Sequence, residues 1–505
     1  MKFFLRYFGE IVLIFLVLLG FWYRINGLET QYSFWTDEAS TARFARGILE
    51  TGLPQISSTG YKENSYFVTH YLTAVSFMFL GKNELSARLP EVVFGILLIL
   101  ITFFIGKKLF NNLTGLGAAA LTTFSYIQIA WSRQARGYVI LEVFLLLSIY
   151  FLYQFLETGK KRPLFLSIVF SFLSIWTHTL GLIVVPIIFF GLLWKINLKV
   201  FLSKRTSLLI TLFSIGLIII CSNFRYAISW VYNYKIINFG KEIFLSYYHS
   251  LFWRQYSLIS FLTYLGFLAL LNRKKKNLFL ILFSFTVIYL FIISFLIAVP
   301  FEKYALPIFP IMFLVSSYSL FFISNYFSKT KIGKTLVFSF FLLFILLNGD
   351  KFSIKPRQFY TLNLDMREIP EIDYKGIYSF VESKIGDYRD REKTAIVDLS
   401  HDLPFWYLGE KIPVFIPRND VSEAIKENPN SGAVFLHNLE EVKEIYDRYP
   451  KGFVVLVEHN FRFYPSGLVE FCREKLNLEK REEFAWFSPD WNRWPIELYS
   501  WDKNK

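Results

Sequence analysis

Two adjacent carboxylates, Asp37 and Glu38, follow Trp35 directly after the first long apolar segment of the chain. Residues 1–349 contain 31 Lys and Arg but only 12 Asp and Glu, and Asp37 is their single aspartate. A carboxylate at a membrane surface can accept a proton from an acceptor hydroxyl, or it can hold a divalent cation against a phosphate. The alternative is an interfacial loop with two solvated carboxylates. The scarcity of acidic residues favours a chemical role.

A second group of candidate residues lies in the run AWSRQARGY at 130–138. On a helix, Arg133 and Arg136 would face the same way because they are three residues apart, and Tyr138 is close by. Two guanidiniums can hold a phosphate or pyrophosphate in bidentate fashion. Arginines that snorkel to lipid headgroups are the alternative. Basic residues are depleted on the non-cytoplasmic side of membrane proteins, which favours the phosphate site.

Three further polar positions interrupt apolar segments. His178 lies in WTHTLG, and Glu142 lies in YVILEVFLL. Lys303 and Tyr304 begin the run KYALPIFP, in which two prolines can expose backbone groups toward a cavity. Polar groups at membrane depth are functional hypotheses by default, and Lys303 is a further phosphate candidate. A structural histidine and an interfacial anchor at Lys303 remain the alternatives.

The elements that must position these residues are membrane spans. The chain has 505 residues, of which 54% are hydrophobic, and its mean hydropathy is +0.39. Segments of roughly 17–25 apolar residues are long enough to cross a bilayer as helices. The stretch 66–80, which contains His70, is shorter and is expected to be an interfacial helix. The eleven expected spans are approximately 8–25, 87–106, 113–131, 137–156, 163–179, 180–195, 207–222, 257–271, 278–299, 305–324 and 335–348.

Short basic segments between the spans predict how the chain is oriented in the membrane. Under an eleven-span count they all fall on one side, which the positive-inside rule makes the cytoplasm. We therefore expect Asp37, Glu38, the arginines at 132–137 and the C-terminal part on the non-cytoplasmic side. The net charge of +14 lies in these loops without a basic stripe or recognition motif, so no nucleic-acid partner is expected. The basic segments are 1–6, 106–112, 157–163, 195–206, 272–277 and 328–334.

Residues 350–505 form a second predicted domain that differs in kind from residues 1–349. They carry 23 Lys and Arg against 28 Asp and Glu, a net charge of −5, whereas residues 1–349 carry +19. Short β-rich runs alternate with amphipathic helical stretches, which predicts a soluble α/β domain with a mostly parallel sheet. The expected strands are 394–400, 412–416, 432–437 and 453–459, and the expected helices are 376–386, 438–449 and 467–476.

Two segments leave alternatives open. The Trp-dense run at 486–501 is expected to pack against the membrane interface or the sheet, with a sugar platform as the alternative. The aromatic and basic loop at 223–255 fits either amphipathic helices lying in the interface or a mobile lid over a site. Cys221 and Cys472 lie in an apolar and a polar part respectively, so we expect no disulfide between them.

These motifs, in this order, resemble the GT-C fold glycosyltransferases over about residues 8–325. The most similar group comprises the bacterial and archaeal relatives of protein O-mannosyltransferases and lipid A aminoarabinose transferases. The motifs that carry the resemblance are TDEAST at 36–41, the stretch 79–110 with Gly81, Glu84, Arg88, Leu89 and Pro90, WSRQARGYVILEV, WTHTLGLIVVP and EKYALPIFP.

The resemblance implies a multi-pass cell-membrane enzyme that moves a sugar from a polyprenyl-phosphate donor to an acceptor outside the cytoplasm, with inversion. The acceptor class, whether lipid, glycan or protein, stays open. Asp37 would be the general base or electrostatic partner, with Glu38 beside it, and any bound divalent metal ion would be held by these two. Arg133, Arg136 and Lys303 would neutralise the leaving lipid phosphate. The remaining substrate-binding residues implied are Arg88, Tyr138, His178 and Tyr304.

The sequence departs from the family pattern at two places. SYFVTHYL at 65–72 stands where relatives carry a His-Pro-Pro or Pro-Pro-Leu-Tyr motif, and Lys303 stands in place of an arginine. Lysine keeps the charge but loses bidentate geometry. A lipid or glycan transporter and a non-catalytic envelope scaffold are the competing functions. Inverted repeats and helices broken near the midplane, which are typical of transporters, do not stand out.

Overall fold

The structure of the protein is a computed structural model with two compact units. Unit 1 comprises Met1–Asn26, Asn64–Thr69 and Leu89–Asp365, and unit 2 comprises Gly27–Glu63, His70–Arg88 and Met366–Lys505. The residues that the structure describes are 2–28, 33–63, 65–195, 243–272, 275–297, 299–348, 351–352, 354, 373–386, 388–428, 430–482 and 496–503.

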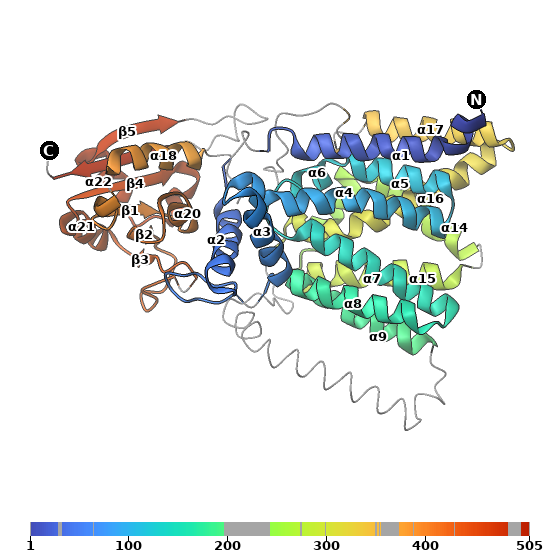
Figure 1. The fold of residues 1–505 in the computed structure, drawn as a ribbon, viewed down its shortest axis with the longest axis horizontal. Coiled ribbons are helices and arrows are strands. Elements are labelled where there is room, and N and C mark those ends of the chain that lie inside the picture. The colour runs from blue at the N-terminus through green and yellow to red at the C-terminus, as the bar shows by residue number, and fades with distance from the viewer. Residues whose placement is uncertain are drawn as a thin grey trace, which may run out of the picture. The chain divides into compact units, whose positions relative to one another are not determined.

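Unit 1 is helical, and Figure 1 shows its long helices lying side by side. Two helices belong to both units. The helix α3 begins in unit 1 and ends in unit 2, whereas α4 begins in unit 2 and ends in unit 1. The elements are α1 (Lys2–Ile25), α3 (Phe67–Leu80), α4 (Glu84–Leu109), α5 (Asn112–Phe124), α6 (Tyr126–Trp131), α7 (Tyr138–Thr158), α8 (Lys161–Thr177), η1 (Thr179–Ile183), α9 (Val184–Lys195), α13 (Leu245–Ser250), η2 (Leu251–Gln255), α14 (Ser257–Asn272), α15 (Lys276–Phe295), η3 (Glu302–Ile308), α16 (Phe309–Phe327) and α17 (Lys331–Asn348).

Small residues allow neighbouring helices of unit 1 to approach closely. A Cβ atom placed on Gly106 of α4 would lie 2.8 Å from the Cα of Gly115 in α5. Ser317 of α16 donates a hydrogen bond of 2.8 Å to the carbonyl of Thr114 in α5. Glycine, alanine and serine at helix contacts are typical of membrane bundles, where association depends on close packing and interhelical hydrogen bonds.

Each predicted span that the structure describes overlaps one or two of these helices. Five described helical segments are long and apolar enough to cross a membrane: Glu84–Leu109, Tyr138–Thr158, Lys276–Phe295, Glu302–Phe327 and Lys331–Asn348. The predicted span at 113–131 is divided into α5 and α6 at Ser125. The predicted span at 207–222 lies outside the described residues, as does 223–242 of the predicted loop, whereas 245–255 is helical.

Unit 2 is an α/β sandwich around one sheet with the strand order β3-β2-β1-β4-β6-β5. The first four strands run parallel, and β6 pairs antiparallel with both β4 and β5. The strands are β1 (Thr394–Asp398), β2 (Val414–Pro417), β3 (Val434–Leu436), β4 (Lys451–Val457), β5 (Asn477–Glu482) and β6 (Ile496–Asp502).

Both faces of this sheet are covered by helices. Val397 of β1 packs in a core with residues of α21 (Leu439–Arg448) and α22 (Leu468–Lys475). The next residue, Asp398, points to the opposite face because side chains alternate along a strand. There it accepts a hydrogen bond from Tyr378 of α18 (Tyr374–Ile385). The helix α20 (Asp402–Leu408) packs against α18, and α19 (Tyr388–Arg391) precedes β1.

The Trp-dense run ends in the sheet rather than in a separate surface. Trp501 lies in β6, is 4% exposed and belongs to the sheet core, as the packing interpretation predicts. The rest of the run before residue 496 lies outside the described residues. The sequence-based fold class, a polytopic helical membrane protein with a C-terminal α/β domain, is confirmed.

Unit 2 also contains α2 (Thr36–Thr51), which lies far from the sheet in sequence. The sequence predicts a domain boundary between residues 349 and 350. The contact pattern instead groups residues 27–63 and 70–88 with the C-terminal sheet. The helix with Asp37 in its first turn is therefore part of the α/β unit.

Candidate active site

The carboxylate pair lies in the first turn of α2. The helix follows Trp35, whose backbone is extended at φ −97° and ψ 170°. Carboxylates in a first turn interact favourably with the partial positive charge of the helix N-terminus. The side chain of Asp37 is half-buried, whereas Glu38 is fully buried. The two neighbouring carboxylates therefore occupy different environments.

Glu38 forms a buried ion pair with Arg88 of α4. The Nε and Nη2 atoms of Arg88 each donate a hydrogen bond of 2.8 Å to one carboxylate oxygen of Glu38. Both side chains have no exposed surface. This parallel arrangement is the bidentate geometry that gives arginine–carboxylate pairs their strength and direction.

Arg88 also orders the chain that leads into α2. Its guanidinium donates to the carbonyls of Leu28 and Ser33 at 3.2 and 3.1 Å. It lies over the ring of Phe34, 5.0 Å from the ring centre. The Arg88 side chain thus holds both the chain that leads into α2 and Glu38, the third residue of that helix.

A cation–aromatic cluster, defined here as Tyr66, Arg136, Tyr138, His178, Lys303 and Tyr304, lies in unit 1. The Tyr138 ring lies 4.8 Å from the His178 ring and 6.4 Å from the Tyr304 ring. The Arg136 guanidinium lies 5.6 Å from the Tyr66 ring centre, and the Lys303 ammonium lies 5.7 Å from that of Tyr304. The Tyr66 ring, in turn, lies 5.0 Å from the His178 ring. Residues from four separate sequence motifs therefore meet at one place.

The hydrogen bonding of His178 indicates which of its ring nitrogens carries the proton. Its Nδ1 atom accepts a hydrogen bond of 3.0 Å from the backbone N–H of Leu180 at the start of η1. A neutral imidazole that accepts at Nδ1 carries its proton on Nε2. His178 can therefore act as a hydrogen-bond donor through Nε2.

Two residues of this region were missed by the sequence-based reasoning. Glu91 accepts hydrogen bonds from the backbone N–H groups of Gly137 (2.6 Å) and Val139 (3.2 Å), so it holds the start of α7 between Arg136 and Tyr138. Its signal in the sequence is a carboxylate inside an apolar helix. Tyr66 has φ +60° and is the one non-glycine residue with positive φ among the described residues. Such a conformation is uncommon for a bulky residue and has no signal in the sequence.

Solved structures have a fold similar to that of this chain. The crystal structure of ArnT from Cupriavidus metallidurans in the apo state has a TM-score of 0.61, 11% identity and 97% coverage of both chains. The same protein bound to undecaprenyl phosphate has a TM-score of 0.58, 12% identity and 98% coverage of both chains. ArnT is a GT-C glycosyltransferase. This chain has the GT-C fold.

Other comparisons agree with the GT-C fold. The archaeal oligosaccharyltransferase AglB from Archaeoglobus fulgidus, in complex with an inhibitory peptide and a dolichol-phosphate, has a TM-score of 0.55 at 10% identity. That match covers 89% of this chain and 70% of AglB. The model of the family described as dolichyl-phosphate-mannose-protein mannosyltransferase matches residues 65–225. An uncharacterized protein from Aquifex aeolicus (strain VF5) is 24% identical over 164 residues, which span 32% of this chain and 33% of that protein.

Within this GT-C fold, Arg133 lies in a different setting from the one the sequence predicts. The segment 132–137 is not helical, so Arg133 and Arg136 do not share a helix face. Arg133 is fully buried, and its Nη1 atom donates to the carbonyls of Tyr23, Arg24 and Asn26 at 3.0, 3.1 and 2.8 Å. The last carbonyls of a helix lack partners within the helix, and Arg133 supplies one for the end of α1.

The other predicted residues are brought together in two groups. Arg136, Tyr138, His178, Lys303 and Tyr304 meet in the cation–aromatic cluster of unit 1. Asp37, Glu38 and Arg88 lie together in unit 2. Glu142 accepts a hydrogen bond of 3.2 Å from Gln128. His70 is buried in unit 2, with its ring 5.0 Å from that of Phe44.

The described residues do not form a metal site made of protein ligands alone. Among them, no three His, Cys, Asp or Glu side chains are grouped so that they could hold a metal ion. Both oxygens of Glu38 accept from Arg88, so the predicted partner of Asp37 in metal binding is already engaged. A cavity of about 360 Å³ in unit 2 is lined by Glu410, Ser431 and Tyr449 among others, and by none of the residues predicted from the sequence.

Proposed function

We propose that this protein is a membrane glycosyltransferase that moves a sugar from a polyprenyl-phosphate donor to a hydroxyl-bearing acceptor, with Asp37 as the general base. The observation that carries the proposal is the contrast between Asp37 and Glu38 at the start of α2. Glu38 is fully buried in an ion pair, and Asp37, the single aspartate of residues 1–349, keeps a half-buried side chain. A base must reach the proton that it removes.

The chemistry requires one displacement. Asp37 accepts the proton of the acceptor hydroxyl, and the hydroxyl oxygen forms a bond to the anomeric carbon of the sugar. The bond between that carbon and the phosphate oxygen breaks, and polyprenyl phosphate leaves with the bonding electrons. A single displacement on the face opposite the leaving group inverts the anomeric carbon. Proton, bond and charge are all accounted for by the donor, the acceptor and one carboxylate.

The cation–aromatic cluster supplies the expected stabilisation of the leaving phosphate. Arg136 and Lys303 bring two positive charges to the cluster that contains His178, whose Nε2 can donate a hydrogen bond. Preorganised charges and donors placed where negative charge develops are worth about 10²–10³ in rate per group. Arg133 donates hydrogen bonds to the backbone carbonyls at the end of α1.

Similar proteins support the donor class. The ArnT structure binds undecaprenyl phosphate, and the AglB structure binds a dolichol-phosphate together with a peptide. The predicted loop charges support an active site and a C-terminal domain on the non-cytoplasmic face of the cell membrane, because the basic segments gather on the opposite side. A lipid, glycan or protein acceptor is compatible with this arrangement.

The deciding experiment compares Asp37→Asn with the wild-type protein in lipid nanodiscs. The probes are undecaprenyl-phosphate hexoses and undecaprenyl-phosphate aminoarabinose, each offered with envelope lipids and peptides as acceptors. Mass spectrometry measures acceptor-dependent release of undecaprenyl phosphate. We expect release by the wild type and a loss of at least about 10³-fold in Asp37→Asn, as for removal of a general base together with its charge.

Glu50→Gln is the matched control because Glu50 lies at the exposed end of the same helix. It should retain wild-type transfer. Wild-type transfer by Asp37→Asn would overturn the role of Asp37. Movement of the lipid across the bilayer without release of free polyprenyl phosphate would favour a transporter instead.

A further inference from the structure

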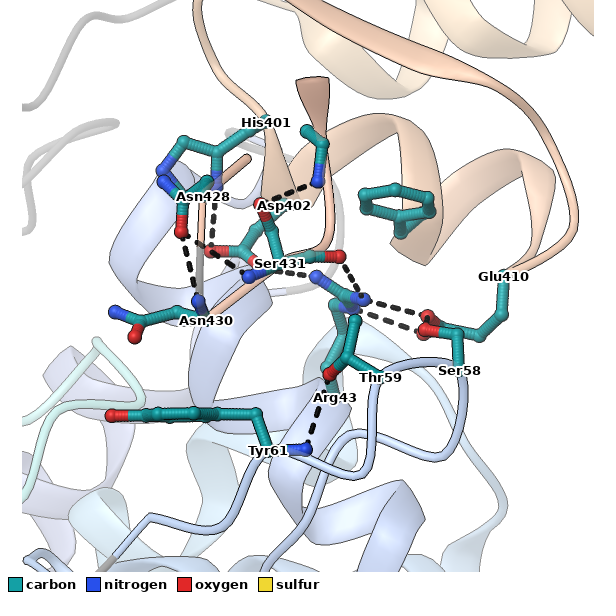
Figure 2. Close-up of polar contacts among 12 residues, drawn as sticks. Arg43, Ser58, Thr59, Tyr61, His401, Asp402, Glu410, Asn428, Asn430 and Ser431 are labelled. Atoms are coloured by element: carbon teal, nitrogen blue, oxygen red, sulfur yellow. Dashed lines mark hydrogen bonds and ion pairs between the residues drawn. The ribbon is translucent and has the colours of Figure 1, made fainter. Parts of the chain in front are cut away.

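The helix α2, which carries Asp37 in its first turn, is bound to the C-terminal sheet domain by a buried ionic network. Arg43, two turns after Asp37 in α2, has a side chain with no exposed surface. Its Nε and Nη2 atoms donate to the two carboxylate oxygens of Glu410 at 2.9 and 2.6 Å. Its Nη1 atom donates to Asp402, the first residue of α20. Figure 2 shows the guanidinium of Arg43 pointing between these two carboxylates.

Neighbouring groups complete the network around Glu410. Arg46, one turn further along α2, forms a second ion pair with Glu410. Ser58 donates a hydrogen bond of 2.8 Å to the same carboxylate. The Arg43 guanidinium also lies 4.4 Å from the ring centre of Phe405 in α20. The orientation of α2 is therefore fixed by the Arg43 guanidinium, which binds the two carboxylates and packs on the Phe405 ring.

The chain that enters α2 is bound to the same domain. The backbone N–H of Phe34 donates to the hydroxyl of Tyr407 in α20 at 3.1 Å, and that hydroxyl donates to Glu84. Ser33 donates to Asp373 at 3.0 Å and accepts from the N–H of Lys375 at 2.9 Å, at the start of α18. All these residues belong to unit 2. The domain thus holds the backbone on both sides of Asp37.

We propose that the C-terminal α/β domain positions the Asp37 carboxylate, with Arg43 and Tyr407 as the positioning residues. This inference rests on the proposed role of Asp37. The short helix α20 carries both anchors, because Asp402 binds α2 after Asp37 and Tyr407 binds the chain before it. A functional group must be held to within about 0.5 Å, and a misplacement of about 1 Å can cost about 10²-fold in rate.

A contact that only holds α2 and α20 together would not need buried ion pairs. Burying charges costs desolvation energy, and replacing a buried ion pair with apolar residues is often neutral or stabilising. Bidentate pairs contribute geometric specificity that apolar packing lacks. The Arg43 network therefore fits a positioning role better than simple adhesion between α2 and α20.

The test measures the transfer reaction in Arg43→Ala, Arg43→Lys and Tyr407→Phe. We expect kcat to fall about 10²-fold in Arg43→Ala. The loss should be smaller in Arg43→Lys, which keeps the positive charge but cannot form the bidentate hydrogen bonds. Tyr407→Phe should lose about tenfold in kcat. The KM for the lipid donor should stay within about threefold in all three, because the donor-binding cations are untouched.

Arg473→Ala is the matched control. Arg473 forms an ion pair of 3.0 Å with Glu497 in the same domain but is half-exposed. The Arg473→Ala variant should have the kcat of the wild type. Wild-type kcat in Arg43→Ala and in Tyr407→Phe, with Asp37→Asn inactive, would overturn the positioning role and leave the proposed function intact. If Arg43→Ala does not fold, Asp402→Asn and Tyr407→Phe decide by the same kcat criterion.

A readout without turnover separates the two proposals. Asp37→Cys places a thiol at the position in question, and its rate of maleimide labelling reports its surroundings. We expect at least about a threefold change in that rate when Arg43→Ala or Tyr407→Phe is added, because the anchors of α2 and of the preceding chain are released. Unchanged labelling in both double variants would contradict the positioning role even if Asp37→Asn were fully active.

Discussion

Arg88 and Glu38 face each other in a planar pair with two hydrogen bonds of 2.8 Å, and neither side chain reaches solvent. The pair connects the beginning of α4 to the first turn of α2. Its geometry explains how two consecutive carboxylates come to lie in different environments. Glu38 becomes a fixed point of the structure, and Asp37 is presented beside it.

Removing one partner of this pair should destabilise the protein strongly. Glu38→Gln leaves the buried Arg88 charge without its counter-charge, and breaking a buried ion pair costs roughly 3–5 kcal/mol. The expected result is a clearly lower midpoint of thermal unfolding for the detergent-solubilised protein, measured by intrinsic fluorescence.

Glu10→Gln is the control for this prediction. Glu10 pairs with Lys107 at 3.5 Å, and both side chains are exposed. Pairs of this kind contribute about 0–1 kcal/mol, so the control should unfold close to the wild type. Equal midpoints for Glu38→Gln and Glu10→Gln would show that the Arg88 pair does not stabilise the fold.

The helical part of the fold could be predicted because its signal is local. Runs such as α7 and α15 are apolar over a whole bilayer thickness, and this depends only on neighbouring residues. The parallel strands β1, β2, β3 and β4 were also predicted, because their apolar runs alternate with amphipathic helices. The antiparallel strands β5 and β6 were not. The sequence of β5, NLEKRE, is polar, and its place in the sheet depends on pairing with β6.

The candidate site could be predicted only as residue types. The sequence indicates that Asp37, Arg136 and Lys303 are charged residues at positions where charge is uncommon. It does not indicate what each side chain contacts. The partners of Arg133 are backbone carbonyls more than 100 residues away, and no local pattern records them. The connection of α2 to the sheet domain likewise depends on contacts between Arg43 and residues beyond position 400.

Charge in the cation–aromatic cluster should govern the rate of transfer. Arg136→Gln and Lys303→Gln each remove a positive charge beside His178, and each should lower kcat by about 10²–10³-fold. Lys303→Arg should retain most activity because it keeps the charge. Release of undecaprenyl phosphate measures the effect. Arg162→Gln, in the exposed start of α8, should behave as wild type. A wild-type kcat in both cluster variants would remove the cluster from the mechanism.

Acid should weaken the Arg43 network. Burial opposes ionisation of Asp402 and Glu410, but the charges of His401 and Arg43 lower the pKa of Asp402, and Arg43 and Arg46 lower the pKa of Glu410. A carboxylate whose pKa is lower in the folded state stabilises above its unfolded value and loses that contribution as pH falls through the folded value. The ordinary pKa values of these two carboxyls are 3.8 and 4.5. The stabilisation should therefore be complete at pH 7 and should decline as the pH falls below these ordinary values.

The comparison between wild type and Arg43→Gln isolates this effect, because the other titrating groups are common to both proteins. The difference between their midpoints of thermal unfolding should be large at pH 7 and should shrink toward pH 3. A difference that is independent of pH would mean that Arg43 stabilises the fold through packing on Phe405 rather than through its carboxylate partners.

Gly137 should tolerate no side chain, because it combines a left-handed backbone with a close neighbour. Its φ is +72°, and a Cβ atom there would collide with the Thr69 hydroxyl. Gly81 has φ +80°, but the nearest neighbour of a Cβ atom placed there, the Asn83 side chain, would lie 3.8 Å away, at ordinary contact distance. The left-handed conformation costs an alanine about 1–2 kcal/mol. Gly81→Ala should lose about that much stability. Gly137→Ala should lose more stability and also lose transfer activity, since Arg136 and Tyr138 flank it.

Adding Thr69→Ala should recover part of the stability lost in Gly137→Ala and none of that lost in Gly81→Ala. Recovery in neither would show that backbone strain alone accounts for the effect.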